Sequence, residues 1–284
     1  MIPEAMARLR RVPRIRRARG YRLYADNGRR IVDLWQGGGR AILGHRGANI
    51  VTRLKAVLDR GVLVPFPSPA EHRLVRAVGR LFAGFPPYRV AVFSSEARAI
   101  GALSRATGWA PPACLPAEPV IAAVDPGADR PAPTAVSYWR PFLPAWDAAA
   151  YLGAGGILLP ILPAGMLSDA QVLVYPPGGF ELESDLLSEP VLTILATAAD
   201  ALCSAAGRSA IPVTGFASAG PYLVPMPVVG VSSPGDYDTV FDRFLGAGVL
   251  LSPEPSVPSI YPGDLSDGER RILDDVASEA SKQK

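Results

Sequence analysis

Two serines and a glutamate stand where a predicted strand (88–93, YRVAVF) meets a predicted helix (94–108, SSEARAIGALSRATG). The first N–H groups of a helix have no partner inside the helix, and its N-terminus favours negative charge. Ser94, Ser95 and Glu96 therefore form a candidate anion site. The alternative, which we favour, is that the two serines only cap the helix.

A second candidate lies in the segment GGGRAILGH at 37–45. Its consecutive glycines, Gly38 and Gly39 among them, permit a close approach of the backbone to another group. The imidazole of His45 follows in the next turn. Two roles stay open for His45, a structural residue that caps this turn or a catalytic group.

Lysine chemistry is not expected, because the chain has only Lys55, Lys282 and Lys284. Lys55 belongs to a predicted helix and the other two to a terminal tail, so all three are predicted to face solvent. The two cysteines lack the spacing of a metal site, and no metal is expected. We interpret them as reduced thiols of a cytoplasmic protein.

The charge is unevenly distributed along the 284 residues, although the net charge is only +3. Residues 8–22 contain eight arginines and no acid, whereas the rest of the chain carries 21 basic and 26 acidic residues. Such an arm either lies on its own subunit or a dimer mate, which we favour, or binds an acidic partner. Nucleic acid is disfavoured because no aromatic residues or recognition helix accompany the arginines. No apolar run reaches the length of about 18 residues that a membrane span needs.

The hydrophobic periodicity predicts alternating strands and helices, typical of an α/β fold with a parallel sheet in the middle of the chain. Asn27-Gly28 marks a hairpin within 19–35. Further helices are predicted at 49–60, 68–82, 188–207, 235–248 and 265–280, and further strands at 120–124, 155–162, 171–175, 210–216, 227–231 and 249–253. The apolar stripes of the first two helices are Ile50, Leu54, Val57 and Leu58, and Leu74, Val75, Val78, Leu81 and Phe82.

Several of these segments, in this order, resemble the class III aminotransferases, which are pyridoxal-phosphate (PLP) enzymes of fold type I. They include the hairpin 20–34 with the following GGGRAILGH, the helix-loop-helix at 57–82, VAVFSSEARAIGAL, VLVYPPGG, AIPVTGF and YDTVFDRFLGAGVLLSP. The resemblance implies that Ser94, Ser95 and Glu96 correspond to the segment that holds the PLP phosphate. It also implies that Gly38, Gly39, His45 and Thr214 lie near the substrate cleft.

The chain departs from the family where the chemistry is done. The phosphate segment lacks its glycine, and Ala210 stands where the family has the acid that bonds the pyridine nitrogen. Tyr175 replaces the glutamate of the family's E-P pair. No lysine lies between Phe216 and Pro227, where the resemblance would place the lysine of the Schiff base. No catalytic residue is therefore assigned.

The predicted architecture is an abridged PLP-transferase-like fold with a mostly parallel central sheet. We divide the chain into a basic arm (1–18), an N-terminal small-domain or interface segment (19–55), an abridged large α/β domain (56–226) and a C-terminal small α+β domain (227–284). The N- and C-terminal segments together build the small domain.

Three functions stay open on the sequence. The first is a non-catalytic, dimeric aminotransferase-like protein with a vestigial anion or ligand cleft. The others are a PLP enzyme with an atypical or partner-supplied base, and a PLP-independent enzyme that reuses the cleft. No cofactor is expected, and any bound PLP would lack an internal aldimine. The expected partner is a second copy or an active aminotransferase relative, and a membrane is not expected.

Overall fold

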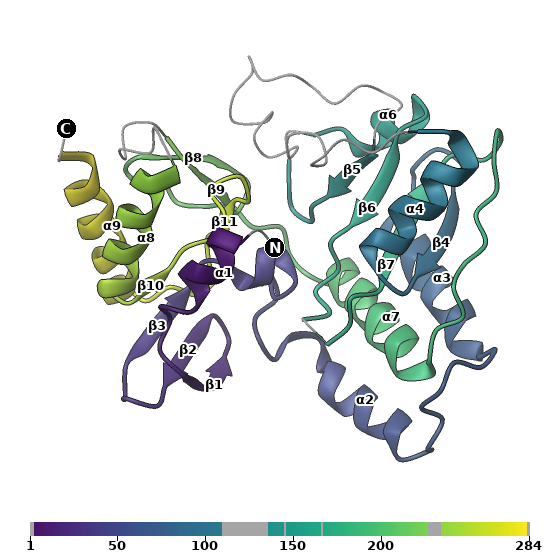
Figure 1. The fold of residues 1–284 in the computed structure, drawn as a ribbon, viewed down its shortest axis with the longest axis horizontal. Coiled ribbons are helices and arrows are strands. Elements are labelled where there is room, and N and C mark those ends of the chain that lie inside the picture. The colour runs from purple at the N-terminus through teal and green to yellow at the C-terminus, as the bar shows by residue number, and fades with distance from the viewer. Residues whose placement is uncertain (1–2, 110–135, 145, 166, 227–233, 283–284) are drawn as a thin grey trace.

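Four strands form the central sheet, in the order β4-β7-β6-β5 (Figure 1). The computed structural model describes residues 3–109, 136–144, 146–165, 167–226 and 234–282. The strands are β4 (Arg89–Phe93), β5 (Val136–Trp139), β6 (Ile157–Pro160) and β7 (Gln171–Tyr175). β5 and β6 pair in parallel, whereas β7 is antiparallel to both β4 and β6.

The expectation of a mostly parallel sheet is wrong for these strands, and the lengths of the connections explain why. Only residues 161–170 join β6 to β7, and a parallel crossover needs a dozen or more residues. The longer connection from β5 to β6 contains helix α6 (Ala148–Gly153) and does return in parallel. The predicted strand at 120–124 lies outside the described residues.

Helices cover both faces of this sheet. Side chains alternate along β4 and β7, so that Val92, Val172 and Val174 face one core while Ala91 and Leu173 face the other. The first core is completed by α3 (Pro69–Leu81) and α7 (Glu189–Cys203), with α2 (Ile50–Leu58) packed beside α7. The second core is completed by α4 (Glu96–Thr107).

The apolar stripes of α2 and α3 differ from the predicted ones. The buried residues of α3 include Leu74 and Val78, but Val75 is 44% exposed. On α2, Val57 is buried whereas Leu58 is 46% exposed. The predicted start of α3 is confirmed, because the hydroxyl of its N-cap Ser68 accepts a hydrogen bond from the N–H of Ala70.

The two ends of the chain build a smaller unit together, as predicted (Figure 1). Its sheet contains the strands β1 (Ile15–Arg19), β2 (Arg22–Ala25), β3 (Arg30–Asp33) and β10 (Val249–Leu250). The turn between β2 and β3 contains Gly28 with a φ of 83°, which suits glycine. Helices α8 (Pro234–Gly246) and α9 (Asp267–Lys282) complete its core.

A third sheet lies between these units, formed by β8 (Phe216–Ala219), β9 (Tyr222–Pro225) and β11 (Ser259–Ile260). The predicted strand at 210–216 is wrong for its first six residues, because regular pairing begins only at Phe216. Pro212 lacks the N–H that a ladder needs, and Thr214 and Gly215 form a turn. The predicted strand at 227–231 lies outside the described residues.

The basic arm lies on its own chain, where α1 (Pro3–Leu9) packs beside α8. The side chain of Arg8 is 1% exposed, and its guanidinium donates to the Asp238 carboxylate and to the carbonyl of Pro253. Arg11 donates to Asp238 and Asp242. The arm then continues into β1, so its last residues are part of the small sheet. Within the described parts of the chain, no helix is long and apolar enough to cross a bilayer.

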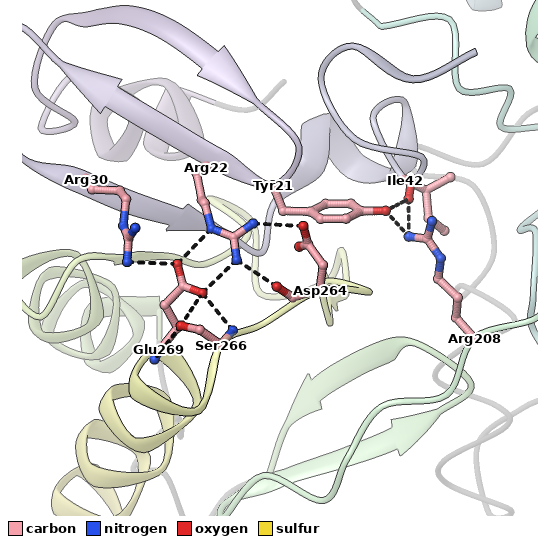
Figure 2. Close-up of polar contacts among 8 residues, drawn as sticks. All are labelled: Tyr21, Arg22, Arg30, Ile42, Arg208, Asp264, Ser266 and Glu269. Atoms are coloured by element: carbon pink, nitrogen blue, oxygen red, sulfur yellow. Dashed lines mark hydrogen bonds and ion pairs between the residues drawn. The ribbon is translucent and has the colours of Figure 1, made fainter.

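The carboxylate of Glu269 ties the last helix to the N-terminal hairpin (Figure 2). It accepts hydrogen bonds from Arg22 at 2.7 and 2.8 Å, and Arg30 lies 3.3 Å away. It also accepts from the N–H and hydroxyl of Ser266, which forms a capping box at the start of α9. The Glu269 side chain is only 4% exposed, and above all the Arg22 hydrogen bonds lower its pKa to about 2.

Arg208 forms a second link, from the end of α7 to the hairpin (Figure 2). Its guanidinium donates to the hydroxyl of Tyr21 and, at 2.6 Å, to the carbonyl of Ile42. It also lies over the rings of Tyr21 and Phe142. The segment after the hairpin is therefore held by residues from both units.

We expect Glu269→Gln to lower the free energy of unfolding at pH 7 by roughly 2–4 kcal/mol, because the largely buried Arg22 loses its buried carboxylate partner and keeps only the exposed carboxylate of Asp264. The folded-state pKa of Glu269 lies below its ordinary value. Its stabilisation is therefore present above about pH 4.5 and lost as the pH falls towards 2.

Urea denaturation of the two proteins between pH 2 and 7 measures this difference. Glu279→Gln, on an exposed position of the same helix, is the matched control and should change stability by less than about 0.5 kcal/mol. A Glu269→Gln effect of the same size at pH 2 and pH 7 would contradict the electrostatic explanation.

Candidate functional site

The anion site predicted from the sequence lies where β4 ends and α4 begins. Ser95 is the N-cap of α4, and its hydroxyl accepts a hydrogen bond from the N–H of Arg98 at 3.2 Å. Ser94 precedes the cap and exposes both a backbone N–H and a hydroxyl as donors. Glu96 begins the helix, and its carboxylate accepts from the hydroxyl of Tyr138 at 2.6 Å.

Asp185 supplies the anion at this helix start. Its Oδ2 accepts from the N–H of Ser94 at 2.9 Å and from the Ser94 hydroxyl at 2.7 Å. Its Oδ1 accepts from the guanidinium of Arg98 at 2.6 Å. The Arg98 hydrogen bond, followed by that of the Ser94 N–H, holds the pKa of Asp185 well below its usual value. The carboxylate is therefore charged at neutral pH.

The backbone around Asp185 is fixed to the edge of the central sheet. β4 is the outer strand, and the carbonyl of its Val92 accepts from the N–H of Asp185 at 2.8 Å. In return, the N–H of Val92 donates to the hydroxyl of Ser184. The N–H of Leu182 donates to the hydroxyl of Tyr175. Asp185 thus belongs to a segment that satisfies the open edge of β4.

A phosphate does not fit beside Ser94 in this arrangement. The two Ser94 donors already donate to Asp185, and the Ser95 hydroxyl is used as the helix cap. A phosphate at the same place would stand against an ionised carboxylate, and like charges in close contact repel. Binding of a phosphate here would require the Asp185 carboxylate to give up its hydrogen bonds with the Ser94 N–H, the Ser94 hydroxyl and the Arg98 guanidinium.

His45 lies in a different part of the molecule, where it is bound to Asp33 at the end of β3. Its Nε2 is 2.8 Å from Oδ2 of Asp33, whose side chain is 2% exposed. The other oxygen of Asp33 accepts from the N–H groups of Trp35 and Gln36. The N–H of His45 donates to the carbonyl of Gly20. These bonds fix the turn that contains His45.

Gly38 and Gly39 contact the larger unit. The carbonyl of Gly38 accepts from the guanidinium of Arg140 at 2.9 Å. Gly39 has a φ of 108°, and a Cβ there would come within 3.2 Å of the Ile161 side chain. Glycine is thus required at position 39 both by its conformation and by this close approach.

A cavity of about 410 Å³ opens beside His45. It is lined mainly by apolar side chains of the arm and hairpin, with Asp33, Trp35, Arg40 and His45 as its larger polar or aromatic groups. A convergent set of polar groups in an apolar pocket is typical of a small-molecule site. The lining contains no hydroxyl, thiol or lysine amine, so its potential nucleophiles are the Asp33 carboxylate and the His45 imidazole, which are bonded to each other.

The structure does not bring the predicted site residues into one cavity. The lining of the His45 cavity excludes Ser94, Ser95 and Glu96, and it also excludes Thr214. Thr214 is exposed in the turn before β8. The sequence reasoning missed Asp185 and Asp33, which contact the predicted residues most directly. Asp33 could have been suspected, because it stands at the end of a predicted strand just before the triple glycine.

Comparison with solved structures shows that the fold is that of aminotransferases. The chain is similar to an ornithine aminotransferase from Plasmodium yoelii, with a TM-score of 0.63 at 13% identity over 95% of this chain and 93% of the other. It is likewise similar to the acetylornithine aminotransferase from Elizabethkingia anophelis, with a TM-score of 0.62 at 12% identity over 96% and 94% of the two chains. This confirms the predicted fold class, and at these identities the likeness concerns the fold alone.

Relatives in sequence match only parts of the chain. An uncharacterized protein from Treponema pallidum is 36% identical over 124 residues, which are 41% of this chain and 39% of that protein. A glutamate-1-semialdehyde 2,1-aminomutase from Syntrophus aciditrophicus is 33% identical over 87 residues, 30% of this chain and 20% of the enzyme. Each match thus spans less than half of the relative. No known protein-family model matches the sequence.

We expect Asp185→Asn to lower the free energy of unfolding at pH 7 by roughly 1–3 kcal/mol, because the charged acceptor of Ser94 and Arg98 is lost. The pKa of Asp185 is lowered by folding, so its contribution is present above about pH 4 and disappears as the pH falls further. The difference in the free energy of unfolding between Asp185→Asn and wild type should therefore become smaller at acidic pH.

Urea denaturation at pH 7 and pH 3 measures the gap, and hydrogen exchange at the Ser94 amide reports the local effect. Glu183→Gln, at an exposed position two residues away, is the control. Its Ser94 amide should exchange as slowly as that of wild type. Unchanged exchange of the Ser94 amide in Asp185→Ala, which has no side-chain acceptor, would show that the carboxylate does not hold this amide.

Proposed function

We propose that this protein is a non-catalytic relative of the aminotransferases, in which the fold is used for association and ligand binding. The observation that carries the proposal is the hydrogen bonding of Asp185 to both donors of Ser94. The similar solved structures are aminotransferases, and an ornithine aminotransferase from Toxoplasma gondii holds PLP at partial occupancy in its active site. A PLP phosphate does not fit at the corresponding helix start in this chain.

The positions of the lysines support the same proposal. Lys55 is exposed on α2, which packs beside α7 on the face of the sheet opposite α4. Lys282 ends α9, and Lys284 lies outside the described residues. Ala210, aligned with the ring-binding acid of the family, carries only a methyl group. We therefore assign no PLP-dependent step to this chain. The cytoplasmic location proposed from the sequence stays a prediction.

The purified protein mixed with PLP should show no saturable visible absorption band and no transfer of amino groups from ornithine or glutamate. Borohydride trapping followed by mass spectrometry locates any pyridoxyl-lysine, with an ornithine aminotransferase as the positive control. Sparse labelling of the exposed Lys55 would agree with the proposal. One pyridoxyl group per chain on a single lysine, together with transaminase activity, would overturn it in favour of an active enzyme.

An apolar patch supports the second part of the proposal, association with a second copy. Leu63, Val64 and Phe66, in the connection between α2 and α3, are each more than half exposed. On the two flanking helices, Val51, Leu58 and Val75 are each at least 44% exposed as well. A bridge between Pro65 and Ser188 fixes the connection. Large apolar side chains exposed in this number along one helix-loop-helix are typical of an interface.

We expect a homodimer in light scattering, and the double substitution Val64→Asp and Phe66→Asp should convert it to a 30 kDa monomer, because two charges would be buried at the interface. Leu167→Asp, at a residue that is 58% exposed outside the patch, should leave the dimer intact. A monomeric wild type at micromolar concentration would contradict self-association. The remaining candidate would then be an aminotransferase relative, tested by mixing the two proteins.

A further inference from the structure

A groove lined with arginines lies between α2, α3 and α7. These helices belong to the core on the face of the central sheet opposite α4. Its volume is about 590 Å³. Arg53 projects from α2, while Arg73, Arg76 and Arg80 come from one side of α3, at the three- and four-residue spacing that places side chains together. We call this feature the arginine groove.

The floor of the arginine groove is formed by α7, whose small residues leave the space open. Thr193, Ala196, Thr197, Ala201 and Ser204 recur at helical spacing along this floor. The hydroxyls of Thr197 and Ser204 bond to carbonyls of their own helix. The charged groups of the groove are therefore the four arginines and Asp200.

The acids near the groove do not balance its positive charge. Asp200 pairs with Arg80 at the surface. Glu189 accepts from Arg73 at 3.0 Å, but the same oxygen also binds Arg60 at 2.5 Å. In the described parts of the chain, neither Arg53 nor Arg76 has an ion pair or hydrogen bond. Two guanidinium groups with all their donors available thus face a groove that already carries excess positive charge.

The charge and shape of the groove select its ligand. Guanidinium groups bind phosphate oxygens through paired, charge-assisted hydrogen bonds, and several arginines around one space favour a ligand with several negative charges. None of the groove-lining residues is aromatic, so the groove offers no ring on which a nucleobase could stack. This favours recognition of a phosphate chain over recognition of a base.

We propose that the arginine groove binds a linear chain of phosphate groups, supplied either as inorganic polyphosphate or as the triphosphate of a nucleotide. Arg53 on α2 and Arg76 on α3 bind the phosphate chain from the two sides of the groove. Arg80 gives up its ion pair with Asp200 and binds a phosphate oxygen instead. This site is separate from the start of α4 and does not depend on the proposed loss of catalysis.

Isothermal titration calorimetry with sodium tripolyphosphate on the full chain tests the proposal. We expect saturable binding that weakens as salt is raised from 50 to 200 mM, since ionic contacts are screened. The double variant Arg53→Gln and Arg76→Gln should lose at least about tenfold in affinity, because each removes charge-assisted hydrogen bonds. Arg14→Gln with Arg16→Gln, which removes the same charge from exposed positions of the basic arm, is the control and should bind tripolyphosphate as wild type does.

Two further ligands distinguish the sources of the phosphate chain. Equal affinity for ATP and tripolyphosphate would identify the phosphate chain alone as the ligand, and much tighter ATP binding would identify a nucleotide. Binding of a single-stranded oligonucleotide without tripolyphosphate binding would overturn the proposal in favour of a nucleic-acid surface. Absence of binding, or equal loss in the arm control, would also overturn it. Thermal unfolding of each variant confirms that the fold is retained.

Discussion

The carboxylate of Asp185 at the start of α4 is the interaction on which this account of the molecule depends. A helix start at the end of a buried strand needs acceptors for its unpaired N–H groups. Here the Ser95 hydroxyl accepts from the N–H of Arg98, and the Asp185 carboxylate accepts from the N–H and hydroxyl of Ser94, the residue before the cap. Asp185 belongs to a segment that also bonds to the edge of β4, so this segment both pairs with the sheet and places a negative charge beside the helix start. The space where an external anion would bind is consequently part of the protein's own structure.

The remaining polar side chains of the candidate regions serve structure in the same way. Glu96 accepts from Tyr138, and His45 is held by the buried Asp33. Near the junction of the two units, Arg140 binds the Gly38 carbonyl. In contrast, the arginine groove leaves Arg53 and Arg76 without partners in the described chain. Groups available for a ligand are therefore found away from the start of α4, the anion site that the sequence predicted.

Local signals in the sequence were sufficient for most elements, whereas contacts between distant residues were not. The Asn27-Gly28 hairpin, the Ser68 cap and the Ser266–Glu269 capping box follow from residues within a few positions of one another. Asp185 is 91 positions from Ser94, and nothing in its neighbourhood distinguishes it from the exposed Glu183. The direction of β7 was also missed, because the hydrophobic pattern of a buried strand is the same for parallel and antiparallel pairing.

A crystal structure of the protein grown with PLP at neutral pH tests the central claim most directly. The account predicts that Asp185 stays within hydrogen-bonding distance of the Ser94 N–H and hydroxyl, with no phosphate at the start of α4. A PLP phosphate bound to Ser94 and Ser95, with Asp185 displaced, would contradict it.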